Sequence, residues 1–231
     1  MNIINKVGLE AEFFLKDKNN ALVFPARFDF DYDDYIILGE FRSDPGETRE
    51  ETIGNFIKSL CKVRRKAKEN KLSLSFGYEE ITPQFKARIL KEMGTKEIQN
   101  THNIHKIDLL EYSDDVVEFG KIIKSRISAG LHVHFSREVL FSRKIDDKEV
   151  TDKLFLLTET QKRRIIQKMD SIILPKHKLN TVLKYRQPGF YENKSWGFEY
   201  RSLPMYDGFV SLENLEGLVD FSFNCLESLS K

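Results

Sequence analysis

The sequence predicts an α+β protein in which amphipathic helices cover one face of a sheet and polar side chains line the other. Four segments alternate apolar and polar residues with the period of two that is typical of strands: 8–15, 35–42, 127–136 and 197–204. Three segments place apolar residues at helical spacing: 48–71, 158–173 and 212–229. No linker, repeat or low-complexity tract interrupts the chain, so we expect one domain.

Composition excludes several classes of protein. The 231 residues are 40% hydrophobic and 32% charged, which is typical of a globular chain. The net charge of +1 gives no general case for binding nucleic acid or a membrane surface. No apolar run approaches the roughly 20 residues of a membrane span, and the N-terminus lacks a signal-peptide pattern. We therefore expect a cytoplasmic protein, with Cys61 and Cys225 as buried free thiols.

The first predicted strand carries two glutamates on one face. Glu10 and Glu12 alternate with apolar residues, so their Cα atoms lie about 6.6 Å apart at a rise of about 3.3 Å per residue. That separation suits two carboxylates that face one metal cluster. The ordinary alternative is a half-exposed strand with solvated glutamates, although glutamate is disfavoured in strands.

Each of the other three strands carries a similar polar pair: Glu40 and Arg42, His132 and His134, and Glu199 and Arg201. One such pair is ordinary on a solvated strand, but four together favour a shared polar surface. Carboxylates with a histidine suit Mg²⁺ or Mn²⁺, whereas zinc more often recruits cysteine or several histidines. Arginines beside them suit phosphate, because a guanidinium binds phosphate through two parallel donors. These groups are typical of phosphoryl transfer from a nucleotide.

The remaining segments predict smaller elements. Residues 21–28 can form a strand, residues 72–76 another, and residues 82–93 a helix. Thr48 is expected to cap the helix that follows it, with a capping box completed by Glu51. The spacing of His102 and His105 suits metal on a helix, but their segment has the composition of a loop, and we do not expect ligands there.

The motifs resemble those of a known family. Gly-x-Glu-x-Glu at 8–12, Gly-x-His-x-His at 130–134 and Phe-Glu-Tyr-Arg at 198–201 resemble the glutamine synthetase-like carboxylate–amine ligases. The short chain and the segment 39–45, Gly-Glu-Phe-Arg-Ser-Asp-Pro, most resemble the compact phage-type amidoligases (COOH–NH2 ligases) of that superfamily. The resemblance implies the glutamine synthetase-like catalytic fold, a curved antiparallel sheet with a polar concave face. It also implies a mostly helical insertion around residues 47–125.

The resemblance also implies roles for individual side chains. The metal-binding set for Mg²⁺ or Mn²⁺ would be Glu10, Glu12, Glu40, His132 and Glu199. The set that contacts ATP would be Arg42, His134, Arg186 and Arg201. Catalysis would fall to Arg201, which steadies the transferring phosphoryl group, to Arg186 and to Glu40, as the base for the amine. The lack of a Gly-rich Walker loop fits the metal-based nucleotide binding of this superfamily.

The activity implied is ATP-dependent condensation of a carboxylate with an amine through an acyl phosphate. A small-molecule or peptide carboxylate and an amine donor would be the partners, with no nucleic acid and no membrane. The location would be the cytoplasm, of the host if the chain is phage-encoded. A homo-oligomer is allowed, but the chain is too short for the N-terminal domain of glutamine synthetase, which puts its ring assembly in doubt.

Two alternatives remain open at the level of sequence. One is a guanidino-kinase-like phosphotransferase, because the superfamily fold is shared with those kinases. The other is a non-catalytic nucleotide- or peptide-binding module on the same fold. A metal-dependent hydrolase is disfavoured, because His132 and His134 have no third strong ligand nearby in the sequence.

Overall fold

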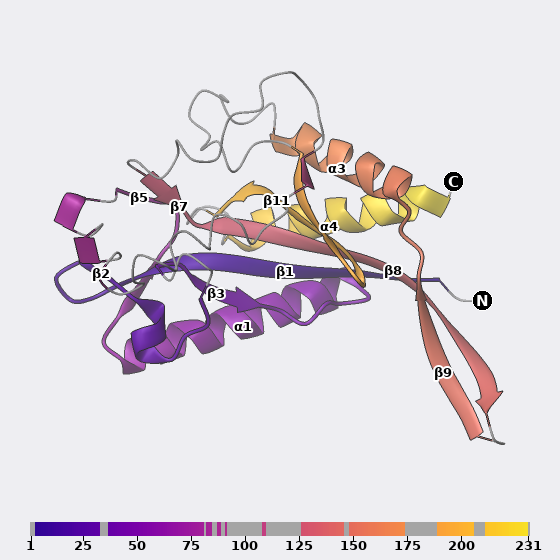
Figure 1. Cartoon of the computed structure of the whole chain (residues 1–231), viewed down its shortest axis with the longest axis horizontal. Coiled ribbons are helices and arrows are strands. Elements are labelled where there is room, and N and C mark those ends of the chain that lie inside the picture. Colours follow the sequence, from indigo (N-terminus) through magenta and orange to yellow (C-terminus); the bar gives the residue numbers. More distant parts are fainter. Residues whose placement is uncertain are drawn as a thin grey trace.

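Two long neighbouring strands form the centre of the fold. The computed structural model describes residues 3–32, 37–80, 82–84, 87–88, 91, 108–109, 126–145, 148–173, 189–205 and 211–230. Strand β1 (Ile3–Lys16) pairs antiparallel with β8 (Gly130–Ile145), from Ile3 opposite Val139 to Ala11 opposite Leu131. Figure 1 shows the two strands side by side across the middle of the molecule. The main sheet extends outward from these two strands.

The sheet around this pair is antiparallel and does not close on itself. Along its main path the order is β2 (Leu22–Val23), β1, β8, β11 (Gly197–Pro204), β10 (Phe190–Lys194) and β6 (Asp108–Leu109). Three strands pair beside that path: β3 (Gly39–Arg42) and β4 (Ser73–Ser75) with β1, and β9 (Lys148–Phe155) with β8. A separate ribbon joins β5 (Tyr78–Glu80) to β7 (Arg126–Ser128). The predicted α+β class with an antiparallel sheet is thus confirmed.

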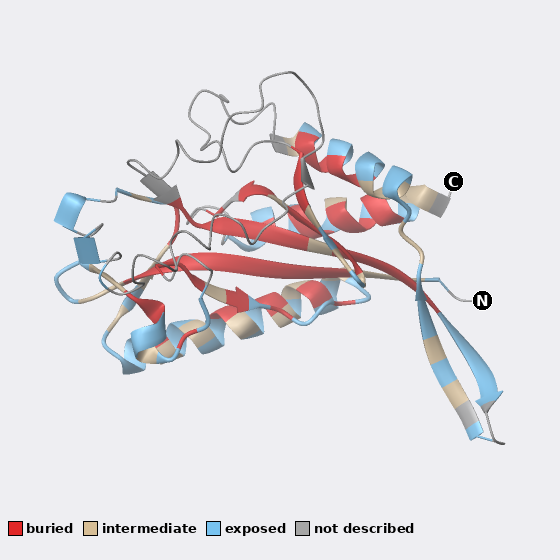
Figure 2. Cartoon of the chain, viewed as in Figure 1, coloured by how far each residue is buried: buried red, intermediate tan, exposed pale blue. Residues whose placement is uncertain are grey.

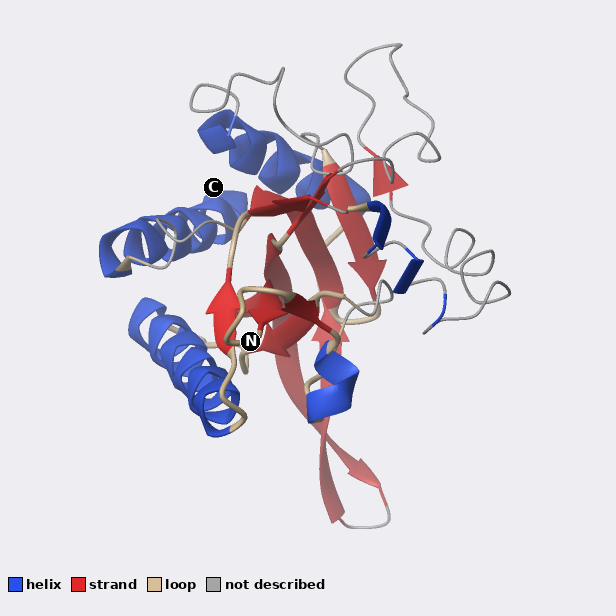
Figure 3. Cartoon of the chain, turned by 90° about the vertical axis from the view of Figure 1, so that its left-hand side faces the viewer, coloured by secondary structure: helices blue, strands red, loops and turns tan. Residues whose placement is uncertain are grey.

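Three helices cover one face of the sheet: α1 (Arg49–Glu69), α3 (Glu159–Ile173) and α4 (Leu212–Glu227). Figure 3 shows all three on the same side of the strands. The core lies between these layers and contains Leu9 and Phe13 of β1 together with Val133 and Phe135 of β8. Within the described part of the chain, no helix is both long and apolar enough to cross a membrane.

The helices begin where the sequence predicts. Thr48 caps α1 by accepting a hydrogen bond from the Glu51 backbone N–H at 3.2 Å. The Glu51 carboxylate accepts from the backbone N–H of Glu47, one residue before the position that a capping box requires. At α3 the box is reciprocal: Thr158 Oγ1 accepts from Gln161 N, and Gln161 Oε1 accepts from Thr158 N. A capping side chain accepts hydrogen bonds from the first backbone N–H groups of a helix. The capping residues in the sequence therefore indicate where these helices begin.

Several predicted strands have different bounds. The strand expected over 21–28 is limited to β2, because Pro25 starts a 3₁₀ helix that runs to Phe28. The segment 127–136 is not one strand: it divides at Ala129, whose N–H donates to Gly77 O. Beyond this break β8 continues to Ile145 and forms a hairpin with β9 that the sequence did not reveal.

Other predictions fall partly or wholly outside the described residues. The described positions of the predicted helix 82–93 beyond residue 82 are helical: 83–84, 87–88 and 91. His102 and His105 lie outside the described residues, as does most of the segment expected to be a helical insertion around 47–125 beyond β5.

The prediction of two buried thiols is half wrong. Both cysteines are free, but Cys61 is exposed on α1, and only Cys225 on α4 is buried. Burial raises the pKa of the Cys225 thiol to about 11, although the nearby Lys168 charge lowers it. The error for Cys61 arose because an amphipathic pattern places a residue on a helix but fixes its exposure only loosely near the edge of the apolar face.

Gly39 offers a stability test, because the Phe13 ring covers it across the β1–β3 pair. A Cβ at Gly39 would lie 2.3 Å from Phe13 Cε2, whereas a Cβ at Gly54 in α1 would have no heavy atom within 4 Å. Gly39→Ala should lower the free energy of unfolding by about 1–3 kcal/mol through overpacking. Gly54→Ala should raise it by up to about 1 kcal/mol through helix propensity. Urea denaturation of both variants measures this, and equal effects would contradict the close packing at Gly39.

Candidate metal and phosphate site

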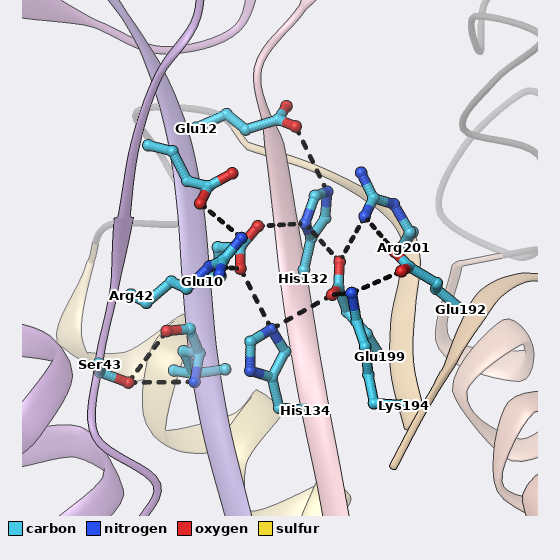
Figure 4. A network of polar contacts seen from close by, with 12 residues as sticks. Glu10, Glu12, Arg42, Ser43, His132, His134, Glu192, Lys194, Glu199 and Arg201 are labelled. Atoms are coloured by element: carbon cyan, nitrogen blue, oxygen red, sulfur yellow. Dashed lines mark hydrogen bonds and ion pairs between the residues drawn. The ribbon is translucent and has the colours of Figure 1, made fainter. Parts of the chain in front are cut away.

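The pairing register brings the four predicted polar pairs together. On β1, Glu10 lies opposite Arg42 of β3 on one side and opposite His132 of β8 on the other. Glu199 of β11 in turn lies opposite His134 of β8. Because residues opposite each other in neighbouring strands point to the same face, side chains from β3, β1, β8 and β11 converge. Figure 4 shows this convergence around His132.

The centre of the site is a triad of Glu10, His132 and Glu199. His132 Nδ1 lies 2.9 Å from Glu10 Oε1 and 2.9 Å from Glu199 Oε1. One ligand-type atom of each residue lies within 4.8 Å of the others. The three side chains are at most 2% exposed. The triad thus offers two carboxylate oxygens and an imidazole nitrogen in a space protected from water.

The electrostatics of the triad are dominated by opposed buried charges. Burial and the Arg201 charge lower the pKa of His132, but the carboxylates of Glu12, Glu10 and Glu199 raise it more, to about 9. Burial raises the pKa of Glu10 and of Glu199, yet hydrogen bonds from His132 outweigh this and hold both below their usual range. Without a bound metal, these contacts favour the imidazolium form of His132, which compensates the buried carboxylates. A metal ion that binds an imidazole nitrogen of His132 would displace a proton from it.

Glu12 joins the cluster from the far side of His132. Its Oε1 lies 3.6 Å from His132 Nε2, while Glu10 contacts the opposite nitrogen of the same ring. Its Oε2 accepts a hydrogen bond from the backbone N–H of Gly130 at 2.6 Å. The imidazole thus lies between the two glutamates of β1. A metal-binding role for Glu12 stays a prediction.

Two arginines flank the triad, one on each side. Arg42 contacts Glu10 at 2.5 Å and Glu40 at 2.7 Å, and its side chain is 63% exposed. Arg201 contacts Glu199 at 2.8 Å, and its side chain is 16% exposed. Carboxylates of the cluster itself thus hold both guanidinium groups beside the triad.

Strand β10 adds two charged residues that the sequence analysis missed. Glu192 contacts Arg201 at 3.0 Å, and Lys194 contacts Glu192 at 2.6 Å and Glu199 at 3.4 Å. The signal was the same alternation seen in the other four strands, Glu192-x-Lys194. It went unrecognised because the flanking segment has the composition of a turn.

A β-bulge in β11 sets the position of Arg201. Tyr200 lies opposite Val133 and Leu203 opposite Leu131, so Arg201 and Ser202 together face the single residue His132. Ser202 Oγ accepts from the Phe190 N–H of β10 at 3.1 Å, which supplies a partner for a backbone donor at the point where the ladder is disturbed. The extra residue thus adjusts the direction of Arg201 without leaving the neighbouring strand unsatisfied.

An aromatic residue borders the other end of the site. The Trp196 ring packs on His134 with centroids 5.3 Å apart, in the turn between β10 and β11. The next residue, Gly197, has φ +155°, and a Cβ there would lie 2.0 Å from Phe135 O. Only glycine permits this approach of the turn to β8. Trp196 was not predicted as a site residue.

Arg186, predicted to contact ATP, lies outside the described residues. The structure does show where the chain returns after it. The Gly189 N–H donates to Asp170 Oδ1 at 3.0 Å, and the Tyr200 hydroxyl donates to the same oxygen at 2.7 Å. Asp170 of α3 therefore ties the end of that segment to the residue that precedes Arg201.

The donor set fits a divalent cation of the Mg²⁺ or Mn²⁺ type. Two buried carboxylates and an imidazole are ligands that such ions accept, and the arginines would repel a free cation less once phosphate balances them. His134 faces the same two carboxylates: its Nε2 lies 3.3 Å from Glu10 Oε2 and 3.7 Å from Glu199 Oε2.

Comparison of the chain with protein-family models, with curated proteins and with solved structures gave no match. The class of site is therefore defined by its own geometry: a buried carboxylate–histidine cluster on the face of an antiparallel sheet opposite the helices, flanked by arginines.

Metal binding can be tested by removing one ligand of the triad. Glu199→Gln keeps the shape of the side chain but removes a negative charge, so the affinity for Mn²⁺ should fall at least ~10-fold. Glu138→Gln is the matched control, because Glu138 is also a buried carboxylate, on β8, but pairs with Lys6 at 2.5 Å away from the triad. Isothermal titration with MnCl₂ measures both variants. Equal Mn²⁺ affinity in the two variants would show that Glu199 is not a ligand.

Proposed function

We propose that the protein is an ATP-dependent carboxylate–amine ligase that forms an amide or peptide bond through an acyl phosphate. The observation that carries the proposal is the buried triad of Glu10, His132 and Glu199, held by three adjacent strands and flanked by Arg42 and Arg201. The resemblance to phage-type amidoligases supports the same conclusion, and with it a glutamine synthetase-like arrangement of the sheet with a polar concave face.

Glu10, His132 and Glu199 are the residues that would hold a divalent cation, with Glu12 and Glu40 as further carboxylates of the same face. A cation bound there supplies positive charge that lowers the cost of gathering ATP phosphates and an acyl phosphate in one place. The ion pairs of His132 with the carboxylates explain how the cluster is stabilised before such a cation binds.

Arg201 is the residue best placed to bind the transferring phosphoryl group. Glu199 and Glu192 hold its guanidinium from two directions, and the bulge in β11 directs it toward the triad. Orientation before the reaction is useful because phosphoryl transfer depends on positioning and charge stabilisation rather than on covalent chemistry by the protein. Arg42 binds phosphate from the opposite flank, where its side chain is largely exposed.

Glu40 is proposed to accept a proton from the attacking amine. It lies at the rim of the site, with a side chain 13% exposed, and its contact with Arg42 at 2.7 Å holds the carboxylate beside the triad. A base must be deprotonated before the amine arrives, and a partly exposed position allows the proton to leave to water afterwards. The nucleophile then displaces phosphate from the acyl group, and the C–N bond forms as the C–O bond breaks.

The proposal is tested with hydroxylamine as a general amine. Purified protein is incubated with Mg²⁺–ATP, hydroxylamine and one carboxylate at a time: free amino acids, peptides or peptidoglycan fragments. A ligase should release ADP only when a carboxylate is present, with a hydroxamate in equal amount, because hydroxylamine traps the acyl phosphate. Phosphorylation of a guanidino compound without any carboxylate would instead show a kinase. ATP binding with no turnover on any substrate tried, amines included, would favour a non-catalytic module.

The role of Arg201 can be tested by a substitution that keeps its charge. Arg201→Lys loses the planar pair of donors, so turnover of ATP should fall at least ~10-fold, equal to about 1.4 kcal/mol of transition-state stabilisation. Arg143→Lys is the control, because Arg143 is also ion-paired, with Asp152, but lies on the exposed hairpin. Initial rates at saturating Mg²⁺–ATP compare the two. Unchanged turnover in Arg201→Lys would remove Arg201 from the phosphate site.

A further inference from the structure

A β-hairpin projects from the body of the protein. The pairing of β1 with β8 ends at Ile3, opposite Val139, and beyond that point β9 is the one described strand that pairs with β8. We call residues 140–145 and 148–155 the arm. In Figure 1 the arm extends away from the helices and the rest of the sheet, and in Figure 2 it is mostly exposed, in contrast to the buried inner part of β8. The arm is not part of the site described above.

The arm is more apolar than an isolated ribbon in water should be. Phe141 is 41% exposed and Leu154 is 54% exposed, and the pairing register places both on one face with Val150. On the opposite face, Leu140 and Phe155 are also exposed. A two-stranded hairpin without packing is at best marginally stable, so a ribbon of this composition should gain stability when further strands pair with it or another surface packs on it.

Among the strands that the structure describes, none pairs with the outer edge of β9. The Leu156 N–H donates to Arg137 O at 2.8 Å, so the pair that these two residues form is a hydrogen-bonded one. Hydrogen-bonded pairs alternate along an antiparallel ladder, so Leu154, Asp152 and Val150 also direct their backbone groups to β8. Thr151 and Lys153 therefore direct theirs away from β8. An edge of this kind is a template for another strand.

We propose that the arm pairs with the arm of a second copy of the chain, β9 against β9, antiparallel about a two-fold axis at Val150. In this register Val150 meets the partner's Val150, and Lys148 lies opposite the partner's Asp152. Because of the two-fold axis, this pair of Lys148 with Asp152 occurs twice. The charges along β9 are thus complementary to those of β9 in a second copy, which makes a second copy the partner that suits this edge.

Other registers fit less well. Shifting the axis to the point between Val150 and Thr151 places Lys148 opposite the partner's Lys153, and it also pairs inward-directed backbone groups with outward-directed ones. Shifting it to Thr151 places Glu149 opposite the partner's Lys153, but it also places the apolar Val150 opposite the partner's Asp152 and leaves two threonines at the centre. Only the axis at Val150 combines opposite charges with an apolar centre. The product is a continuous four-stranded sheet in which Phe141, Val150 and Leu154 of both copies share one face, and such a sheet can be stable where one ribbon is not.

Proline substitutions at the two edges of the arm test the interface. The mass of the native protein in solution, measured by light scattering during size-exclusion chromatography, should be twice the 27.1 kDa of one chain. Thr151→Pro removes an outward N–H that the second copy needs, so this variant should be a monomer. Ser142→Pro is the matched control: Ser142 lies opposite Thr151 and its N–H points to the other edge of the arm, so this variant should remain a dimer.

Charge reversals test the register independently of proline. Lys148→Glu places two acids opposite each other in a homodimer, and Asp152→Lys places two lysines opposite each other, so each variant alone should be a monomer. An equimolar mixture restores both opposite-charge pairs and should give a dimer of one chain of each kind. A monomeric native protein would overturn the proposal. A native dimer that Thr151→Pro leaves intact, or variants that stay monomeric when mixed, would also overturn it.

Discussion

The buried contact of His132 with its neighbouring carboxylates is the interaction on which the rest of the site depends. Glu10 and Glu12 on β1 and Glu199 on β11 lie in the interior on either side of β8, a concentration of negative charge that would oppose folding if nothing compensated it. The imidazolium contacts Glu10 and Glu199 through one nitrogen and approaches Glu12 with the other. Arg42 and Arg201 neutralise the flanks. Ion pairs therefore stabilise the polar face of the sheet, and apolar packing stabilises the opposite face.

Much of this arrangement follows from short-range patterns in the sequence. Alternation with a period of two placed Glu10, His132 and Glu199 on one face of their strands, and the structure brings them together as predicted. Helix α1 begins at the predicted Thr48, and α3 and α4 also match the predicted spacing. In each case the information is local: a side-chain period or a cap that satisfies backbone groups within one turn.

The features that escaped prediction depend on pairing between distant strands. The bulge that directs Arg201 is a shift in the pairing register of β11 with β8, and no local sequence pattern predicts it. Glu192 and Lys194 reach the site because β10 pairs with β11. The arm was missed for a different reason: its mixture of charged and apolar residues has neither a clear helical period nor a strict alternation, and its strands are specified chiefly by each other.

The order of the strands has a consequence for synthesis on the ribosome. The site draws on residues far apart in the sequence: Glu10 is synthesised long before Glu199 and Arg201. Contacts over such sequence distances form late, because a long loop of intervening chain must be closed at a cost in entropy. While translation proceeds, Glu10 and Glu12 lack the strand β8 that compensates them, and the triad cannot exist before β11 has emerged. Ligand binding by the triad can therefore stabilise the finished domain, but it cannot guide the early steps of folding.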